Sequence, residues 1–183
     1  MTLLIKRVSV FGGSISIPGE PDYEAAFHLG CLLGSAGYTV LTGGYIGAME
    51  AVSRGASENG GHVIGVTCDE IETWRPVGPN CWVEEEIRSA RIIDRLSTLI
   101  EACDAAIALP GGVGTLTEIS LMWTCMSTRS ITPKPLILVG SGWQDSFREF
   151  FQTQAKFIPE QQHKLLIFAA DVESAFFRIN SLN

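Results

Sequence analysis

Short apolar runs alternate with longer amphipathic stretches along the whole chain. The apolar runs are rich in Val, Ile and Leu without clear polar alternation, which is typical of strands covered on both faces. These expected strands are Arg7–Phe11, Thr39–Thr42, His62–Val66, Ala105–Leu109, Leu136–Val139 and Leu165–Phe168. The stretches between them have helical patterning, and they are Asp22–Ser35, Tyr45–Asn59, Arg88–Ala102, Gly114–Ser127, Trp143–Ala155 and Val172–Asn180.

This alternation predicts an α/β fold, a doubly wound Rossmann-like parallel sheet flanked by helices on both faces. Right-handed crossovers put every strand-to-helix loop at one edge of such a sheet, where ligands bind. The segment Thr67–Cys81, stiffened by Pro76 and Pro79, interrupts the alternation and is interpreted as a lid or a surface excursion. No linker or repeat divides the chain, so we expect residues 1–183 to form one domain.

Composition and charge narrow the possible functions. The 183 residues are 46% hydrophobic and 18% charged, which is typical of a globular protein, and the net charge of -7 argues against a broad basic surface for nucleic acid. The five cysteines lack C-x-x-C spacing and the three histidines are isolated, so we expect no metal. No segment is apolar for long enough to cross a membrane. We therefore expect a cytoplasmic protein with free thiols.

Glycine clusters follow three of the predicted strands. They are Gly12-Gly13-Ser14 after the first strand, Thr42-Gly43-Gly44 with Gly47 after the second, and Pro110-Gly111-Gly112-Val113-Gly114-Thr115 after the fourth. Glycine lets a ligand approach the main chain closely, and a helix that begins at such a loop directs free N–H groups at an anion. One such turn can be only a tight connection. Three of them at one edge favour a binding site for a phosphate and its sugar.

The glycine loops match neither of the two common nucleotide-binding motifs. The third cluster is not a Walker A loop, because no Gly-Lys-Ser/Thr follows it. The usual dinucleotide fingerprint is also absent, since Gly12-Gly13 lacks a third glycine in register. The expected ligand is a nucleotide or a similar phosphorylated small molecule.

Two charged residues accompany the glycine loops. Glu118 lies about one turn into the helix that starts near Gly114, where it either only favours the helix dipole or orients a ribose hydroxyl or a water. Arg95 lies on the preceding predicted helix, in one row with Arg88 and Arg91. Its spacing alone favours a solvated arginine that pairs with Asp94 or Glu101.

The run Pro110–Glu118 reads P-G-G-x-G-T-x-x-E. With this motif the chain resembles the Lonely-Guy cytokinin-activating phosphoribohydrolases, a family long described as lysine decarboxylases. Supporting matches, over about residues 7 to 155, are Val10-Phe11-Gly12-Gly13-Ser14, Gly43-Gly44-x-x-Gly47-x-Met49, the segments 60–66 and 104–109, Trp123 and Lys134-Pro135.

The resemblance implies hydrolysis of the N-glycosidic bond of a nucleoside 5′-monophosphate, giving free base and ribose 5-phosphate. The family's motif arginine and glutamate match Arg95 and Glu118, which the resemblance makes the catalytic residues. It also implies that no metal or organic cofactor is required, and that the protein is a homodimer in which the helices around these two residues contribute to the contact.

The chain departs from the family pattern at a few positions. The usual M-H-x-R-K element reads Ile92-Ile93-Asp94-Arg95-Leu96, the usual glutamate pair reads Thr117-Glu118, and Tyr45 replaces the third glycine after the second strand.

An alternative function is a binding protein without catalysis, either a nucleotide sensor or a carrier like the molybdenum-cofactor carrier proteins of the same superfamily. Leu96 and Thr117 favour the carrier, whereas Arg95 and Glu118 favour the enzyme. Lysine decarboxylation is disfavoured because no glycine loop contains a lysine that could hold pyridoxal phosphate.

Overall fold

The computed structural model describes residues 4–182, so both ends of the range 1–183 expected for the domain lie outside the described residues. A seven-stranded sheet runs through the molecule, and all of its paired strands are parallel. The strands are β1 (Arg7–Phe11), β2 (Thr39–Thr42), β3 (Val63–Cys68), β4 (Glu85–Ser89), β5 (Ala105–Ala108), β6 (Leu136–Val139) and β7 (Ile167–Ala169). The helices are α1 (Pro21–Ser35), α2 (Ala48–Glu58), α3 (Asp69–Trp74), α4 (Ile92–Glu101), α5 (Val113–Ser127), α6 (Ser141–Thr153), α7 (Glu160–His163) and α8 (Val172–Asn180).

The order of the strands reverses once. In space they lie as β4-β3-β2-β1-β5-β6-β7, so the chain first builds outward from β1 and then returns to its other side with β5. Val8 pairs with Val40 of β2 on one side and with Ala105 of β5 on the other. Ligands of open α/β sheets bind beside such a reversal, at the carboxyl ends of the strands.

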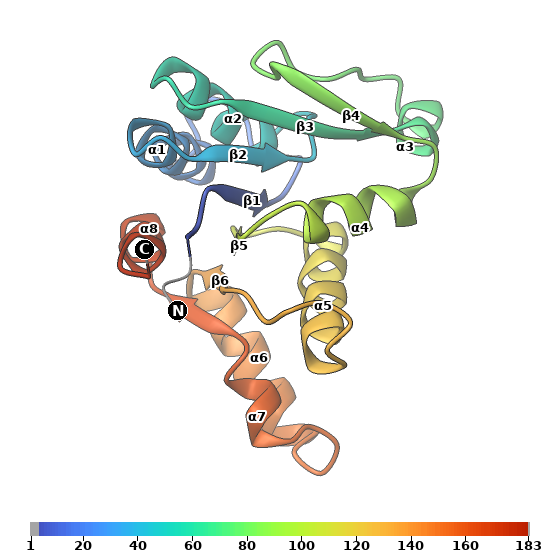
Figure 1. Ribbon diagram of the computed structural model, residues 1–183, viewed down its shortest axis with the longest axis vertical. Coiled ribbons are helices and arrows are strands. Elements are labelled where there is room, and N and C mark those ends of the chain that lie inside the picture. Colours follow the sequence, from blue (N-terminus) through green and yellow to red (C-terminus); the bar gives the residue numbers. More distant parts are fainter. Residues whose placement is uncertain (1–3, 183) are drawn as a thin grey trace.

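Helices cover both faces of the sheet (Figure 1). Alternate residues of each strand point to opposite faces, so Val8 and Val10 pack in the hydrophobic cluster with α1, α2 and α8. Phe11 packs in the other cluster, with α4, α5 and α6. The doubly wound Rossmann-like α/β fold is confirmed, and so is the expectation of strands covered on both faces, since β3, β5 and β6 are buried throughout.

Strand β4 was not expected from the sequence. Its residues Glu85–Ser89 are mostly exposed or half-buried, because β4 is an edge strand with a single neighbour, β3. The expected helix Arg88–Ala102 is wrong at its start, since Arg88 belongs to β4 and α4 begins at Ile92. The expected arginine row is therefore also wrong, and the third glycine cluster follows the fifth strand in place of the fourth.

The segment Thr67–Cys81 is partly regular. Its first residues end β3, and Asp69–Trp74 forms the short helix α3. The helix expected over Tyr45–Asn59 begins only at Ala48, because Gly47 adopts a φ of 75° that a helix does not accommodate. No helix within residues 4–182 has the length and apolar character needed to cross a membrane.

Candidate functional site

A cavity of about 660 Å³ lies where the strand order reverses, at the carboxyl ends of β1, β2 and β5. Most of the residues expected at the site line it, namely Gly12, Gly13, Ser14, Met49, Arg95, Gly111, Gly112, Val113, Gly114, Thr115 and Glu118. Thr42, Gly43, Gly44 and Gly47 are not among the lining residues. Segments far apart in the sequence thus meet in one cavity.

The first and third glycine loops are held together by main-chain hydrogen bonds. The Gly13 N–H donates to Pro110 O at 3.1 Å, and Gly13 O accepts from the Ala48 N–H at 2.9 Å. A Cβ on Gly111 would collide with the Thr115 hydroxyl and lie 3.0 Å from Gly13 N. Glycine is therefore required at position 111 for close contact between the two loops.

Helix α5 begins at the cavity wall. Gly112 is its N-cap, and the N–H groups of Val113, Gly114 and Thr115 have no acceptor within the helix. The first turn contains no acidic side chain that would neutralise the positive end of the helix dipole. This helix terminus can therefore bind an anion such as a phosphate group.

The second glycine cluster does not line the cavity itself but contacts Arg95, which does. Thr42 Oγ1 accepts from the Gly44 N–H at 3.1 Å, and Gly43 O accepts from Arg95 Nη2 at 3.2 Å. A Cβ on Gly43 would collide with the Arg95 guanidinium. The cluster thus makes room for Arg95, which is a different use of glycine from the direct ligand approach expected for it.

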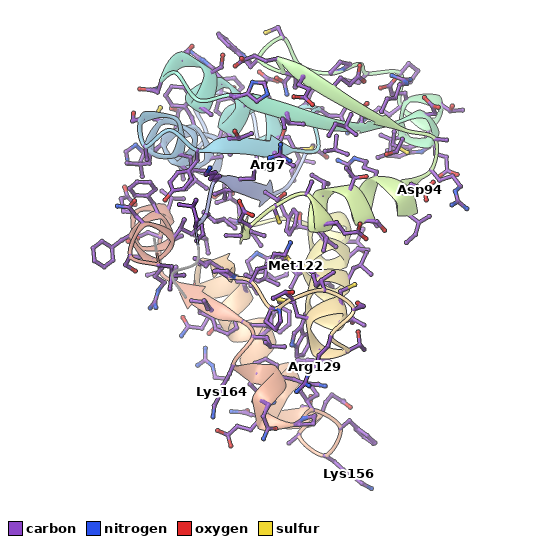
Figure 2. The ribbon with its side chains drawn as sticks, viewed as in Figure 1. Arg7, Asp94, Met122, Arg129, Lys156 and Lys164 are labelled. Atoms are coloured by element: carbon purple, nitrogen blue, oxygen red, sulfur yellow. The ribbon has the colours of Figure 1, made fainter. Side chains whose placement is uncertain are left out.

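Arg95 is buried, with 7% of its surface exposed. Its Nε donates to Val66 O at 2.7 Å, and its Nη1 lies 3.9 Å from Glu118 Oε1. The interpretation as a solvated arginine paired with Asp94 or Glu101 is wrong, because Asp94 pairs with Arg91 and lies at the outer end of α4 (Figure 2). Spacing could not reveal this burial, since the carbonyls that Arg95 binds come from β3 and from the second glycine loop, both distant in the sequence.

Glu118 faces Arg95 from the second turn of α5. Only 8% of its surface is exposed, and burial raises the pKa of its carboxyl to about 7, although Arg95 opposes part of this shift. A carboxyl with such a pKa exchanges its proton near neutral pH, which suits acid–base work. No group of three His, Cys, Asp or Glu within the described residues is placed to hold a metal ion.

Several lining residues were not suggested by the sequence, and among them are Tyr45 and three residues of α3 and its C-cap. Ile71, Trp74 and Arg75 line the cavity from α3 and its C-cap. Trp74 is 79% exposed although it is large and aromatic. An arginine and a tryptophan beside Pro76, in a segment without a clear pattern, were the signal that could have indicated them.

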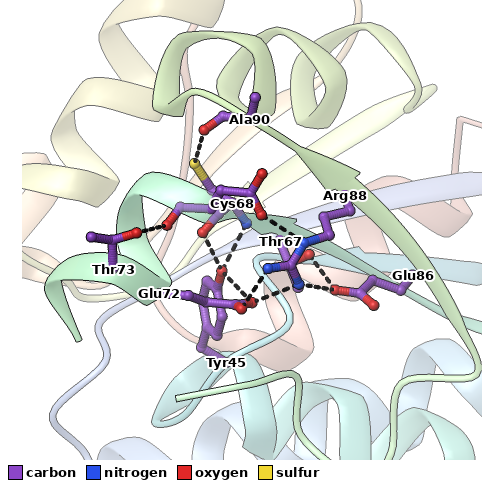
Figure 3. Close-up of polar contacts among 9 residues, drawn as sticks. Tyr45, Thr67, Cys68, Glu72, Thr73, Glu86, Arg88 and Ala90 are labelled. Carbon is purple, nitrogen blue, oxygen red and sulfur yellow. Dashed lines mark hydrogen bonds and ion pairs between the residues drawn. The ribbon is translucent and has the colours of Figure 1, made fainter. Parts of the chain in front are cut away.

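A polar network attaches α3 to the sheet (Figure 3). The Tyr45 hydroxyl accepts from the Cys68 N–H at 2.7 Å and lies 3.3 Å from Glu72 Oε1. The Arg88 guanidinium binds both carboxylate oxygens of Glu72, at 3.2 and 2.7 Å, and donates to Asp69 Oδ1 at 2.7 Å. The network therefore fixes the helix that carries Trp74 and Arg75.

Comparison with known proteins assigns the family. A family model described as possible lysine decarboxylase matches residues 49–179. A probable cytokinin riboside 5′-monophosphate phosphoribohydrolase of Oryza sativa subsp. japonica is 31% identical over 180 residues, covering 95% of this chain and 77% of that protein. The chain belongs to the Lonely-Guy phosphoribohydrolase family. Another Lonely-Guy phosphoribohydrolase of the same plant is 33% identical over 173 residues, covering 90% of this chain and 68% of that protein.

The fold is shared more widely than the Lonely-Guy sequences. The molybdenum cofactor binding protein of Rippkaea orientalis is 24% identical, with a TM-score of 0.75 and coverage of 98% of both chains. At this identity the likeness concerns the fold alone.

The departures from the Lonely-Guy pattern lie mostly away from the cavity. Leu96 is buried and Thr117 is exposed, with its hydroxyl donating to Val113 O, and neither residue lines the cavity. Tyr45 does line it, and the Arg95 Cζ lies 5.8 Å from the centre of its ring. The aromatic ring thus packs beside the arginine of the Lonely-Guy motif.

Proposed function

We propose that the protein hydrolyses the N-glycosidic bond of a nucleoside 5′-monophosphate, releasing the free base and ribose 5-phosphate. The observation that carries this proposal is the buried pair of Arg95 and Glu118 in the same cavity as the N-terminus of α5. The helix terminus would hold the phosphate, and Glu118 would then face the sugar. The activity named for the two rice relatives agrees with this arrangement.

The chemistry needs a charge-stabilising group beside the ribose. When the bond from C1′ to the base nitrogen breaks, its electron pair leaves with the base and positive charge develops on the sugar ring. Ionised Glu118 stabilises that charge and orients a water, which adds to C1′. One water proton is transferred to the departing base, and the hydroxyl remains on the sugar. Arg95 keeps Glu118 in place through their ion pair.

The description of the family model as a possible lysine decarboxylase implies pyridoxal phosphate, and the cavity does not fit that cofactor. Its aldehyde binds a lysine, and no lysine is among the cavity-lining residues of the described chain. Lys134, which lies between α5 and β6, donates from Nζ to Ile100 O at 3.0 Å and also to Cys103 O.

The test is release of free base from AMP and from its isopentenyl-substituted analogue. We expect release by the unmodified protein and a rate at least about 100-fold lower in Glu118→Gln. Glu101→Gln is the matched control, because Glu101 is an exposed glutamate at the C-terminal end of α4. Its rate should equal that of the unmodified protein.

Lack of base release from both nucleotides would contradict the proposal. The carrier alternative makes the opposite prediction for the same protein, namely a phosphorylated pterin that stays bound through purification and is not transformed. Analysis of the small molecules that copurify with the protein therefore distinguishes the two functions.

We also propose that the protein is a cytoplasmic homodimer in which α4 and α5 meet the partner. Four large apolar side chains of these helices are exposed, Ile92 at 44%, Ile93 at 51%, Val113 at 83% and Leu116 at 43%. Burying such side chains is the usual driving force of a permanent interface. Light scattering should give the mass of two chains, and Ile93→Glu should shift it to one. A monomeric unmodified protein would contradict this.

A further inference from the structure

Arg75 lines the cavity and has no acidic partner in the part of the chain that the structure describes. It is the C-cap residue of α3, and its Nη1 lies 3.5 Å from Ser14 Oγ of the first glycine loop. Its Nε is buried and has no hydrogen-bond partner among the described residues. A buried donor without a partner is costly, so an acceptor from a ligand would lower the energy of this arrangement.

The other cavity-lining arginine is already engaged. Arg95 donates to two main-chain carbonyls and lies against the Glu118 carboxylate. Within residues 4–182, by contrast, no carboxylate oxygen lies within 4.0 Å of the Arg75 guanidinium. The charge of Arg75 is therefore available to an anion in the cavity.

Arg75 and the phosphate-binding end of α5 belong to one structural unit. Ser14 follows Gly13, whose N–H is hydrogen-bonded to Pro110 O at the start of the third glycine loop. On the other side, the network of Tyr45, Glu72 and Arg88 fixes α3 (Figure 3). The guanidinium is thus held at the cavity before any ligand arrives, which reduces the entropy cost of binding.

We propose that Arg75 and Ser14 form the second half of the phosphate subsite, completing the half formed by the N-terminus of α5. This inference rests on the proposed function, because it takes a nucleoside monophosphate as the ligand. Guanidinium groups bind phosphate oxygens through paired N–H donors, and a serine hydroxyl supplies one more donor. The subsite would distinguish a nucleoside monophosphate from the corresponding nucleoside.

The experiment measures binding in a Glu118→Gln background, so that substrate is not consumed. Calorimetry with AMP, adenosine and inorganic phosphate is compared for Arg75→Gln, Arg75→Lys and Arg148→Gln. Arg148 is the matched control, because it is an exposed arginine of α6 that does not line the cavity. Circular dichroism establishes that each variant is folded.

We expect Arg75→Gln to weaken AMP and phosphate binding about 10-fold or more, as for other hydrogen bonds to charged groups, and to leave adenosine binding unchanged. Arg75→Lys keeps the positive charge but loses the paired N–H donors of the guanidinium. Its affinity for AMP should therefore lie between those of the background protein and Arg75→Gln. Arg148→Gln should bind like the background protein. Unchanged AMP binding by Arg75→Gln, or an equal loss for AMP and adenosine, would overturn the proposal.

Failure of the subsite and failure of the proposed reaction give different results. If the protein releases base from neither nucleotide, but Arg75→Gln still weakens the binding of AMP and not that of adenosine, the proposed reaction is wrong and the proposed subsite stands. If the unmodified protein releases base and Arg75→Gln, with Glu118 restored, has an unchanged KM, the reaction stands and the subsite is wrong.

Discussion

Glu118 combines burial with a titratable group, and this combination affects stability as well as chemistry. Burial raises the pKa of its carboxyl from 4.5 to about 7. Between these two values the folded state holds a proton that the unfolded chain releases. Below pH 4.5 the carboxyl is protonated in both the folded and the unfolded state, so its burial causes no pH-dependent loss of stability. As the pH rises from there through about 7, the free energy of unfolding falls.

A glutamine at this position cannot ionise, so the effect should disappear in Glu118→Gln. We expect the stability of the variant to improve relative to the unmodified protein as the pH rises from about 4.5 to 7, by on the order of 1–3 kcal/mol. Urea unfolding of both proteins across this range measures the difference. Two curves that run parallel through the whole range would contradict the buried, protonated state of Glu118.

The proposed reaction uses the ionised carboxylate, so its rate has the opposite dependence on pH. The kcat/KM for base release should rise as the pH increases through about 7, because kcat/KM follows the ionisation of the ligand-free protein, in which this is the pKa of the Glu118 carboxyl. A pH–rate profile with AMP well below its KM measures this. A rate that falls over the same interval would assign Glu118 the role of the proton donor to the base.

At the scale of the element, a substitution in the first turn of α5 should have opposite effects on helix stability and on AMP binding. Gly114 is the second residue of the helix, and a Cβ there would meet nothing within 4 Å. Gly114→Ala should raise the helix stability by up to about 1 kcal/mol. It should also weaken AMP binding several-fold, because the methyl group would stand where the phosphate approaches the N–H groups.

Gly142→Ala is the matched control for this change. Gly142 is likewise the second residue of its helix, α6, and has open space around it, but it does not line the large cavity. Calorimetry with AMP and thermal unfolding of both variants test the pair. Equal effects of the two alanines on AMP binding would contradict phosphate binding at α5.

Helix α3 is too short to be stable alone, and its position depends on Arg88. The ion pairs of Arg88 are largely exposed, so Arg88→Gln should change the overall stability little. We expect a local effect, with faster amide hydrogen exchange over residues 69–75 and weaker AMP binding. Exchange that is unchanged in this segment would show that contacts other than those of Arg88 hold α3 in place.

At the scale of the molecule, the sequence predicted those strands and loops whose structure is determined by their own residues. The apolar strands β1, β2, β5 and β6 and the glycine loops were predictable, because burial on both faces and close main-chain contacts select their residues. β4 was not predictable, since an edge strand tolerates Glu85 and Arg88. The burial of Arg95 depends on carbonyls of β3 and the second loop, which only the folded chain brings near it.

The charged groups that line the cavity have a consequence for group-specific chemical modification. Its two cationic side chains among the described residues are Arg75 and Arg95, while Lys156 and Lys164 lie at the far end of the molecule (Figure 2). Acylation of the lysines should therefore leave AMP binding intact, even in a heavily labelled protein. An arginine-selective dicarbonyl should abolish binding, and AMP present during labelling should protect it. Inactivation by the acylating reagent instead would mean that a lysine outside this cavity contributes to binding.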